Sequence, residues 1–418
     1  MNKLYLYFSW ACRLLVGSVF IYSGFVKGID PLGSAYKFTD YFNAFNANWA
    51  SGMAFGLSIF QSMIEFAIGA AILLNLKPKQ SALGALLFMI FYTPLTFILA
   101  LTNPVHDCGC FGDALIMTNW QTFWKNIVLT IPVIYLFAIR KKQPTKLHCY
   151  EQWAGIGASA LFILGISWYA TKHLPLLDFR PYKIGTYIPD GMVYPEGAPA
   201  DVWESKFIYS KDGVNNEFNL QNLPDSTWKF VEAKHLLIKK GYEPPIHDFT
   251  ISDSEGNDIA DQLLSSTNYN FLIVTYNLEK TQIENFEKIN QLVDFCTVNE
   301  FPVYGLTAST DEQIEKFKEK TGAGYDFYAT DEITLKTMIR ANPGILLIKE
   351  GIIINKWNVN DLPTGEQLVE NLLHQSISNY KKQADKYYIY TLILLSILLI
   401  AIYLNLRPIV EQQRRRKL

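Results

Sequence analysis

The sequence predicts a multi-domain membrane protein, an α-helical transmembrane bundle of six spans with a four-helix core, joined to an α/β extracytoplasmic domain. Three observations lead to this prediction. Residues 1–170 and 388–406 are mostly apolar, the region between 171 and 387 has the composition of a soluble protein, and strand and helix patterns alternate after residue 241. The net charge of −2 over 418 residues gives no reason to expect a nucleic-acid partner.

Long apolar segments define the spans, because a helix needs about 20 mostly apolar residues to cross a bilayer. The segments that meet this length are 5–26, 52–75, 81–102, 121–139, 153–170 and 388–404. A cleaved signal peptide does not explain the first segment, since its apolar run is too long and no A-x-A-like site follows. We therefore expect the lipid bilayer to be the main environment of this region.

Lysine and arginine in the short loops predict the orientation of these spans. They gather in alternate loops and after the last span: Lys77, Lys79, Arg140, Lys141, Lys142, Lys146, Arg407, Arg414, Arg415, Arg416 and Lys417. The other loops, 28–50 and 103–120, hold few cations. Both termini are therefore expected in the cytoplasm, with loop 103–120 and the large polar region outside it.

The composition shifts also predict the domain boundaries. The expected parts are a four-helix membrane domain at 1–150, a fifth span at 151–172, a β-rich segment at 173–240, an α/β domain at 241–380, a sixth span at 386–406 and a basic tail at 407–418.

A Cys-Gly-Cys motif lies in the outer loop, in the stretch NPVHDCGCFGD that begins at Asn103. Disulfides persist in such a compartment. Bridged Cα atoms lie within roughly 4.4–6.8 Å, so Cys108 and Cys110 can pair only across a sharp turn, which Gly109 permits. The small ring is expected to be strained, which favours a thiol oxidant over a structural disulfide.

Neighbouring charges affect the reactivity of these thiols. A protonated His106 stabilises a thiolate, as does Lys27 if it reaches this rim of the membrane, whereas Asp107 and Asp113 oppose it. The spacing leaves two other interpretations open. One is zinc held by His106 and Asp113 with both thiols, which we do not favour because C-x-C is tight for one ion. The other is a static disulfide, or free thiols without a role.

Two ionisable residues lie inside the predicted spans. Glu65 lies in the middle of the second span, where a carboxylate is costly and is usually paired or functional. Arg13 in the first span is its expected partner, and a structural ion pair is the favoured interpretation. A proton or quinone site is the alternative, with Tyr92, Thr93 and Pro94 as candidates for its lining.

The first four spans resemble the DoxX-like, MauE (methylamine utilisation) type of membrane protein. The resemblance is carried by a span-one pattern, by Glu65 and by the motif DCGCFGD; the span-one residues are Arg13, Gly17, Phe20, Ser23, Gly24, Lys27, Asp30 and Pro31. It implies a four-helix bundle of the bacterial inner membrane that takes part in periplasmic thiol–disulfide maturation. It also implies that Cys108 and Cys110 are the redox pair.

The outer region divides into two patterns. Short alternating runs predict β structure in 178–240. From 241 the order is strand, helix, strand, helix, strand, strand, helix, which predicts an α/β domain. One face of its first long helix is expected to carry Ile283, Phe286, Ile289, Leu292, Val293 and Cys296.

This second pattern resembles a thioredoxin-like domain of the TlpA or peroxiredoxin type, through PPIHDF and through ANPG around Asn342 and Pro343. The resemblance implies that Pro343 is a cis proline, and that it and Asn342 bind an extended client polypeptide. The position of the family's redox cysteines reads Asn277-Leu278-Glu279-Lys280, so this domain has no C-x-x-C. Cys296 is expected in the core.

These observations support two hypotheses. The first is a membrane thiol–disulfide oxidoreductase or disulfide-maturation factor that acts on periplasmic client proteins and passes electrons to a membrane quinone. No G-x-G-x-x-G indicates a flavin or nicotinamide site. The second is a non-enzymatic scaffold or interaction subunit of a cell-envelope complex.

Overall fold

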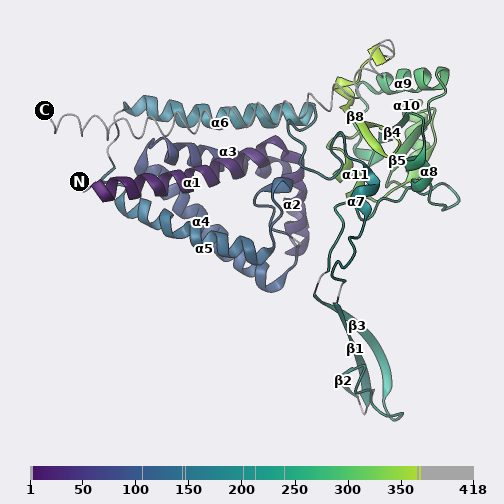
Figure 1. Cartoon of the computed structure of the whole chain (residues 1–418), viewed down its shortest axis with the longest axis horizontal. Coiled ribbons are helices and arrows are strands. Elements are labelled where there is room, and N and C mark those ends of the chain that lie inside the picture. The colour runs from purple at the N-terminus through teal and green to yellow at the C-terminus, as the bar shows by residue number, and fades with distance from the viewer. Residues whose placement is uncertain are drawn as a thin grey trace. The chain divides into compact units, whose positions relative to one another are not determined.

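The computed structural model describes residues 3–105, 107–143, 145, 147–200, 202–211, 213–239, 241–364 and 367–368. Among these residues, five helices are long and apolar enough to cross a membrane. They are α1 (Lys3–Ile29), α3 (Ala54–Leu73), α4 (Pro78–Thr102), α5 (Asn119–Ile139) and α6 (Cys149–Lys172). These helices confirm the first five predicted spans (Figure 1). The sixth, at 388–404, and the tail at 407–418 lie outside the described residues.

Helices α1 and α3 pack with their backbones in close approach. A Cβ added at Gly24 would lie 2.5 Å from the Phe66 amide nitrogen, and one added at Gly69 would lie 2.6 Å from that of Ile21. Small residues allow this distance between membrane helices. The contacts set the register of α1 on α3, and place residue 24 beside residues 62 to 66.

Loop 28–50 contains a helix that the sequence interpretation did not predict. Helix α2 (Pro31–Ala44) begins after Asp30, whose side chain accepts a hydrogen bond from the Gly33 amide at 2.9 Å. Pro31 occupies the first turn, where its missing N–H costs nothing. A short 3₁₀ helix, η1 (Asn48–Met53), then leads into α3.

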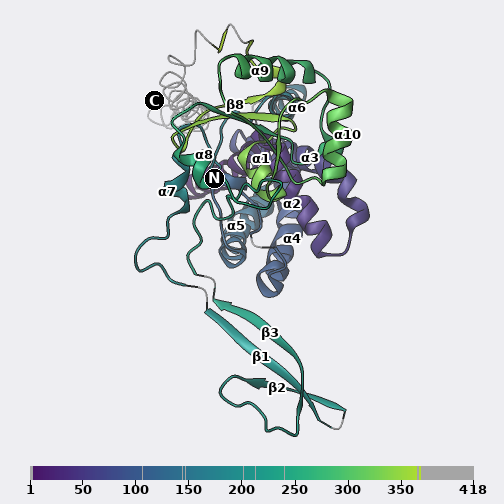
Figure 2. The ribbon, with the colours of Figure 1, turned by 90° about the vertical axis from the view of Figure 1, so that its right-hand side faces the viewer.

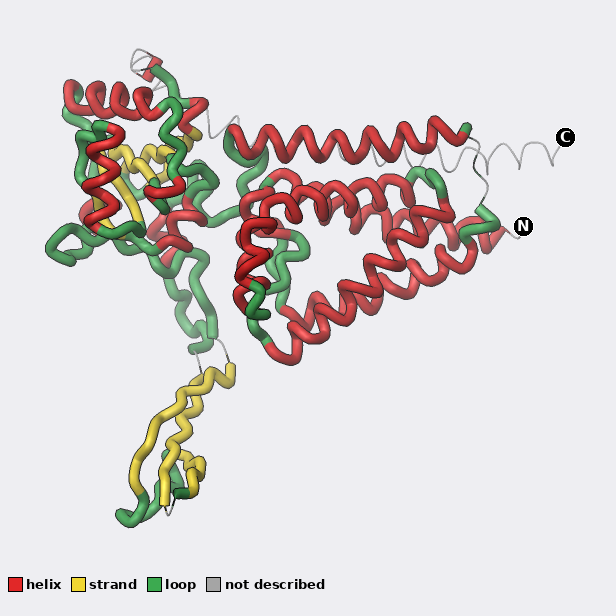
Figure 3. The backbone as a smooth tube through the Cα atoms, turned by 180° about the vertical axis from the view of Figure 1, so that it is seen from behind, coloured by secondary structure: helices red, strands yellow, loops and turns green. Residues whose placement is uncertain are grey.

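The α/β domain is built on a five-stranded sheet with the order β6-β5-β4-β7-β8. Its strands are β4 (Asn270–Val274), β5 (Val303–Thr307), β6 (Phe327–Ala329), β7 (Gly344–Lys349) and β8 (Ile352–Asn358). Strand β4 is buried along its whole length, parallel to β5 and antiparallel to β7. Figure 3 shows how the strands gather in this domain while helices form the membrane part. The observed order differs from the predicted one, because both strand β6 and a short helix lie between the second long helix of the domain and β7.

The helices of this domain are α8 (Ala260–Ser265), α9 (Phe286–Val298), α10 (Asp311–Thr321) and α11 (Glu332–Met338). Helix α9 buries the predicted apolar face, with Cys296 fully inside the core. Ile283 was wrongly placed on that face, because α9 begins only at Phe286 and Ile283 stays exposed. Helix α10 ends at Gly322, which adopts the left-handed conformation typical of a C-terminal cap.

A buried ionic cluster attaches β8 to the segment that follows α6. The Asp178 carboxylate contacts Arg180 at 2.7 Å and Lys356 at 2.8 Å, and the Lys356 ammonium also donates to the Tyr182 carbonyl at 2.9 Å. All three charged side chains are nearly inaccessible. The chain between the membrane helices and the α/β domain is thereby part of the domain's core.

Residues 186–249 form a separate compact unit. It contains α7 (Ile188–Met192) and a three-stranded sheet of order β2-β1-β3, built from β1 (Val202–Lys211), β2 (Val214–Asn219) and β3 (Lys229–Lys239). Both pairings are antiparallel, and Figure 2 shows β1 and β3 paired over most of their length. The alternating runs in this part of the sequence therefore do form strands.

Candidate functional site

The Cys-Gly-Cys motif forms the sharp turn that its sequence predicts. Gly109 and Gly112 both have positive φ angles, of 63° and 51°. The Gly109 amide donates to the Asp107 carboxylate at 2.8 Å, and the Gly112 amide donates to the Gly109 carbonyl at 3.1 Å. The turn places the Cys108 and Cys110 sulfur atoms 3.0 Å apart. The two thiols therefore lie within reach of one another.

Side chains from α1 and α2 hold the backbone of this turn. The Tyr41 hydroxyl donates to the Cys108 carbonyl at 2.6 Å, and the Ser23 hydroxyl donates to the Cys110 carbonyl at 2.8 Å. Lys37 pairs with Asp107 at 2.6 Å. Sequence reasoning missed Tyr41 and Lys37 because it missed α2. The sequence does contain a signal for this helix, because Asp30 followed by Pro31 is typical of a helix N-terminus. Lys37 and Tyr41 are four residues apart, so they lie on one face of such a helix.

The two thiols differ in their surroundings. Cys108 is buried, with 8% of its surface exposed, whereas Cys110 is partly exposed. The hydrogen bond with Cys108 lowers the pKa of Cys110 below its ordinary value, although removal of the sulfur from solvent acts in the opposite direction. The positive charges of Lys125 and Lys27 add to this lowering, and the same hydrogen bond raises the pKa of Cys108. Cys110 is therefore the more acidic thiol.

An ion pair lies inside the bundle, directly below the turn. The Lys27 ammonium contacts both Glu65 carboxylate oxygens at 2.8 Å, and the two side chains are 6% and 3% exposed. The Ser23 hydroxyl also lies 2.9 Å from a Glu65 oxygen, so its single proton is shared between Glu65 and the Cys110 carbonyl, and Gln61 donates to Glu65 at 3.1 Å. Ser23 thus joins the ion pair to the Cys110 carbonyl. Lys27 is a buried partner of the site and not a rim residue.

The expectation that Arg13 pairs with Glu65 was wrong. Arg13 lines a different cavity, with Asn75, Ser81 and Gln143 among its neighbours. Fourteen residues separate Arg13 from Lys27, which is roughly 21 Å along a helix at 1.5 Å per residue. The glycine contacts between α1 and α3 bring Glu65 to the level of Ser23 and Lys27, and this register is not visible in the sequence.

A small cavity adjoins the ion pair and Cys110. Its volume is about 30 Å³, and its lining includes Tyr92, as expected, together with Lys27, Glu65, Cys110 and Lys125. A cavity needs only about 10–15 Å³ of such space to hold a water molecule, so this one is large enough for water. The Lys125 ammonium lies 4.5 Å from the centre of the Phe111 ring and was not anticipated. The sequence feature that could have identified Lys125 is the presence of a lysine within an apolar span.

The structure gives no support to a zinc site. Among the described residues, no group of three or more histidine, cysteine, aspartate or glutamate side chains is arranged to hold a metal ion. Asp113 instead pairs with Arg340 at 3.0 Å. His106, which sequence reasoning assigned to the thiolate or to zinc, lies outside the described residues.

The proline loop of the α/β domain contains the expected cis bond, between Asn342 and Pro343. The Asn342 carbonyl accepts from the Gln282 amide at 3.0 Å, and its side chain donates to the Asn277 carbonyl at 2.9 Å. Residues Leu278–Lys280 form a 3₁₀ turn where redox cysteines were expected in the family. The loop is thus packed against a segment without thiols, and its role in client binding stays a prediction.

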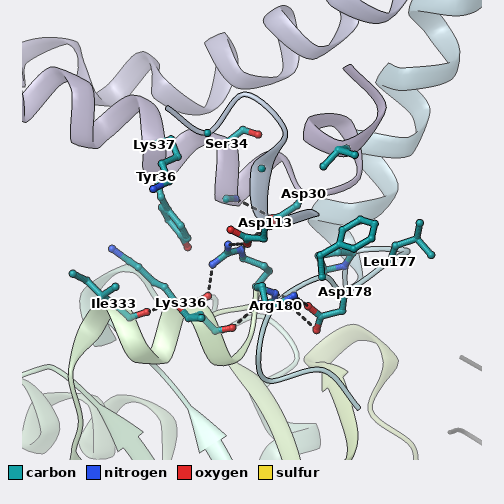
Figure 4. Close-up of a pocket in the computed structure, with 18 of the residues that line it drawn as sticks. Asp30, Ser34, Tyr36, Lys37, Asp113, Leu177, Asp178, Arg180, Ile333 and Lys336 are labelled. Atoms are coloured by element: carbon teal, nitrogen blue, oxygen red, sulfur yellow. Dashed lines mark hydrogen bonds and ion pairs between the residues drawn. The ribbon is translucent and has the colours of Figure 1, made fainter. Parts of the chain in front are cut away.

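A larger cavity, of about 220 Å³, lies between the mouth of the bundle and the α/β domain (Figure 4). Its walls come from α2, the segment 175–180, α11 and the backbone of Gly109 and Gly112. Tyr36 of α2 and Tyr276 of the α/β domain meet at its edge, with their hydroxyls 3.3 Å apart. The Lys336 ammonium lies over both rings.

These features define the class of protein: a membrane helix bundle with a dithiol turn, followed by an α/β domain that has a cis proline loop and no cysteine at Leu278–Lys280. Residues 5–139 match the model of the family described as methylamine utilisation protein MauE, so the membrane domain is of the MauE type. Residues 203–240, in the separate unit, match a domain of unknown function, DUF8463.

Known proteins resemble parts of the chain. Protein TlpB of Flavobacterium psychrophilum is 28% identical over 162 residues, which are 34% of this chain and 40% of TlpB. The similarity therefore spans two fifths of the length of that relative. Among solved structures, StoA of Bacillus subtilis is 17% identical with a TM-score of 0.23, covering 29% of this chain and 93% of StoA. A thioredoxin-like protein of Bacteroides caccae is 11% identical with a TM-score of 0.19, covering 75% of this chain and 82% of that protein.

Proposed function

We propose that this protein is a membrane thiol–disulfide oxidoreductase that works through Cys108 and Cys110. The observation that carries the proposal is the turn itself, which holds the two sulfur atoms 3.0 Å apart. Ser23 and Tyr41 fix the carbonyls of both cysteines, and the bundle supplies Lys27 and Lys125 near the more acidic thiol. A static loop does not need a depressed thiol pKa, whereas thiol exchange does.

The chemistry that we propose is the oxidation of a client dithiol. A client thiolate attacks the Cys108 sulfur of the oxidised pair, and Cys110 leaves as the thiolate, because the more acidic thiol is the better leaving group. A second client thiolate then attacks the client sulfur of this mixed disulfide and releases Cys108. The client loses two electrons and two protons, and the pair becomes a dithiol.

The reduced pair needs an electron acceptor, for which we propose a membrane quinone. The cavity next to Cys110 has a volume of about 30 Å³, far below the roughly 300–1,000 Å³ of small-molecule pockets, so it does not form a quinone pocket as the side chains stand. The proposal rests on chemistry alone: a dithiol at the membrane surface needs a two-electron acceptor, and quinones are soluble in the bilayer.

We place the protein in the bacterial inner membrane, with both termini cytoplasmic and the large domain in the periplasm, on the distribution of lysine and arginine. Its partners are then periplasmic client proteins. Pro343 and Asn342 remain the predicted client-binding residues of the thioredoxin-like domain. Asn277 to Lys280 lack cysteine, so this domain does not exchange thiols at that position itself.

Trapping of a mixed disulfide tests this function. In Cys110→Ser the reaction can run only in reverse at Cys108: its thiolate attacks the disulfide of an oxidised client, and one client sulfur leaves as a thiolate. The mixed disulfide then accumulates, because Cys110 is not there to release the client. We expect Cys110→Ser to accumulate several times more reducible adduct than Cys108→Ser. The double variant is the control and should give none. Equal, background levels of adduct in all three variants would contradict the proposal.

A second candidate is a scaffold or interaction subunit of an envelope complex. The missing C-x-x-C favours it, since that domain can only bind its partners. It predicts that Cys108→Ser is silent in cells, whereas loss of the thioredoxin-like domain is not. The oxidoreductase proposal predicts that both changes cause the same defect.

A further inference from the structure

Arg340 connects the thioredoxin-like domain to the mouth of the bundle. It lies between α11 and the proline loop, and only 7% of its side chain is exposed. Its guanidinium contacts Asp30 at 3.0 Å and Asp113 at 3.0 Å, and it donates to the Lys336 carbonyl of its own domain. One planar, permanently charged group therefore joins three segments, which suits arginine better than lysine.

Both carboxylates that Arg340 contacts lead directly to the dithiol turn. Asp113 follows Cys110 by three residues and belongs to the 3₁₀ turn η2 (Gly112–Ala114) that ends the motif. Asp30 caps α2, the helix that carries Lys37 and Tyr41. Both ends of the turn are therefore linked to one side chain from the other domain.

The packing around Arg340 is close enough that a side chain at Gly33 would displace Asp30 and Arg340. A Cβ added there would lie 2.4 Å from an Asp30 carboxylate oxygen and 2.8 Å from the Arg340 guanidinium. Gly33 lies in the first turn of α2, where alanine would otherwise stabilise the helix by about 0.5–1 kcal/mol. Gly33 therefore leaves room for the Arg340 guanidinium, although glycine is a poor helix former.

We propose that Arg340 is a positioning residue for the dithiol, through which the redox-silent thioredoxin-like domain holds Cys108 and Cys110 in contact. This inference deepens the proposed function, since it assigns a task to the domain that lacks cysteines in its expected redox position. This role of Arg340 can be tested without knowing the client protein. The interaction surface is the α11 side of the domain, and its partner is the outer mouth of the chain's own bundle.

The proposed role of Arg340 is to hold the geometry of the turn, and not to act on Cys110 through its own charge. The charged or titratable groups that face Cys110 come from the turn and from every helix packed against it: Cys108, Lys27 of α1, Tyr41 of α2, Glu65 of α3, Tyr92 of α4 and Lys125 of α5. Arg340 is absent from this lining and contacts the turn through Asp113. Replacing Arg340 also leaves the Asp113 carboxylate unpaired near the turn, which acts on the Cys110 thiolate through charge. A variant that keeps every charge is therefore needed to isolate the effect of a moved turn, in which the two sulfur atoms no longer meet.

The test is the pH dependence of Cys110 alkylation, read by peptide mass in the full chain in lipid nanodiscs. Arg340→Gln should raise the pH midpoint by at least one unit, which is a tenfold loss of thiolate below the midpoint. Arg340→Lys should give an intermediate shift. Lys316→Gln, which removes an exposed cation of the same domain that pairs with Glu312 on α10, is the control and should give none.

A second pair of variants leaves every charge in place. Gly33→Ala crowds Arg340 and should also raise the midpoint, whereas Gly56→Ala, with open space around its Cβ, should not. Labelling of the buried Cys296 reports whether the domain stays folded. If Arg340→Gln unfolds the domain, the Gly33→Ala result decides. Wild-type midpoints in the folded Arg340 and Gly33 variants would overturn the inference, even if mixed disulfides still form.

Discussion

Replacement of Glu65 or Lys27 gives the sharpest separation between a structural and a chemical role for the buried ion pair. Glu65→Leu leaves the Lys27 ammonium without its carboxylate, and Lys27→Met leaves the carboxylate with hydrogen bonds from Ser23 and Gln61 only. Both side chains are more than nine-tenths buried, so bulk water does not reach the position of the missing partner. The double variant removes both charges together.

The stability cost follows from this burial. Breaking one partner of a buried ion pair costs about 3–5 kcal/mol, which is about 10²–10⁴-fold in the unfolding equilibrium. Replacing both partners with apolar residues is often close to neutral. We therefore expect each single variant to lose about 3–5 kcal/mol and the double variant to lose clearly less than the sum. Denaturant unfolding in bicelles, followed by circular dichroism, measures this cycle.

The alkylation midpoint of Cys110 provides a second measurement, because the two variants should shift it in opposite directions. Lys27 lowers the pKa of Cys110 and Glu65 raises it. Lys27→Met should therefore move the alkylation midpoint of Cys110 to higher pH, and Glu65→Leu should move it to lower pH. A purely structural disturbance would move both midpoints in the same direction. That outcome, or no movement in either variant, would refute the reasoning that the pair acts on the dithiol.

Two further changes test the turn. Gly109→Ala forces a side chain into a backbone with a φ of 63° and places its Cβ 3.1 Å from Lys37, so we expect about 1–2 kcal/mol of strain and slower closure of the disulfide in a glutathione redox buffer. Gly157→Ala, which has open space around its Cβ, is the control and should close at the wild-type rate. Tyr41→Phe removes the donor to the Cys108 carbonyl, at a cost of about 0.5–1.5 kcal/mol in chemical denaturation, and should slow the same reaction.

Local signals made part of this structure predictable. Hydropathy located the spans, and Gly109 between two cysteines indicated a turn that lets the sulfurs meet. The cis bond at Pro343 and the lack of thiols at Asn277 to Lys280 followed from the resemblance to thioredoxin-like domains. Each of these features depends on neighbouring residues along the chain, or on a motif that the family shares.

The partners of the site depended on non-local packing. Glu65 was assigned to Arg13 because the sequence does not show how α1 and α3 are aligned, and the glycine contacts at Gly24 and Gly69 decide that alignment. The link from Arg340 to Asp113 joins residues 227 positions apart. Helix α2 was missed because its length is short for a span and it lies within a loop of the hydropathy pattern.

The most direct test of the central claim is the redox state of Cys108 and Cys110 in the full chain. Free thiols are labelled with one alkylating reagent across a series of glutathione ratios, and the remainder are labelled with a second reagent after reduction. We predict that the peptide containing both cysteines exchanges two labels together as the buffer becomes oxidising, while the buried Cys12 and Cys296 do not change. Two thiols that remain free at every ratio would contradict the account.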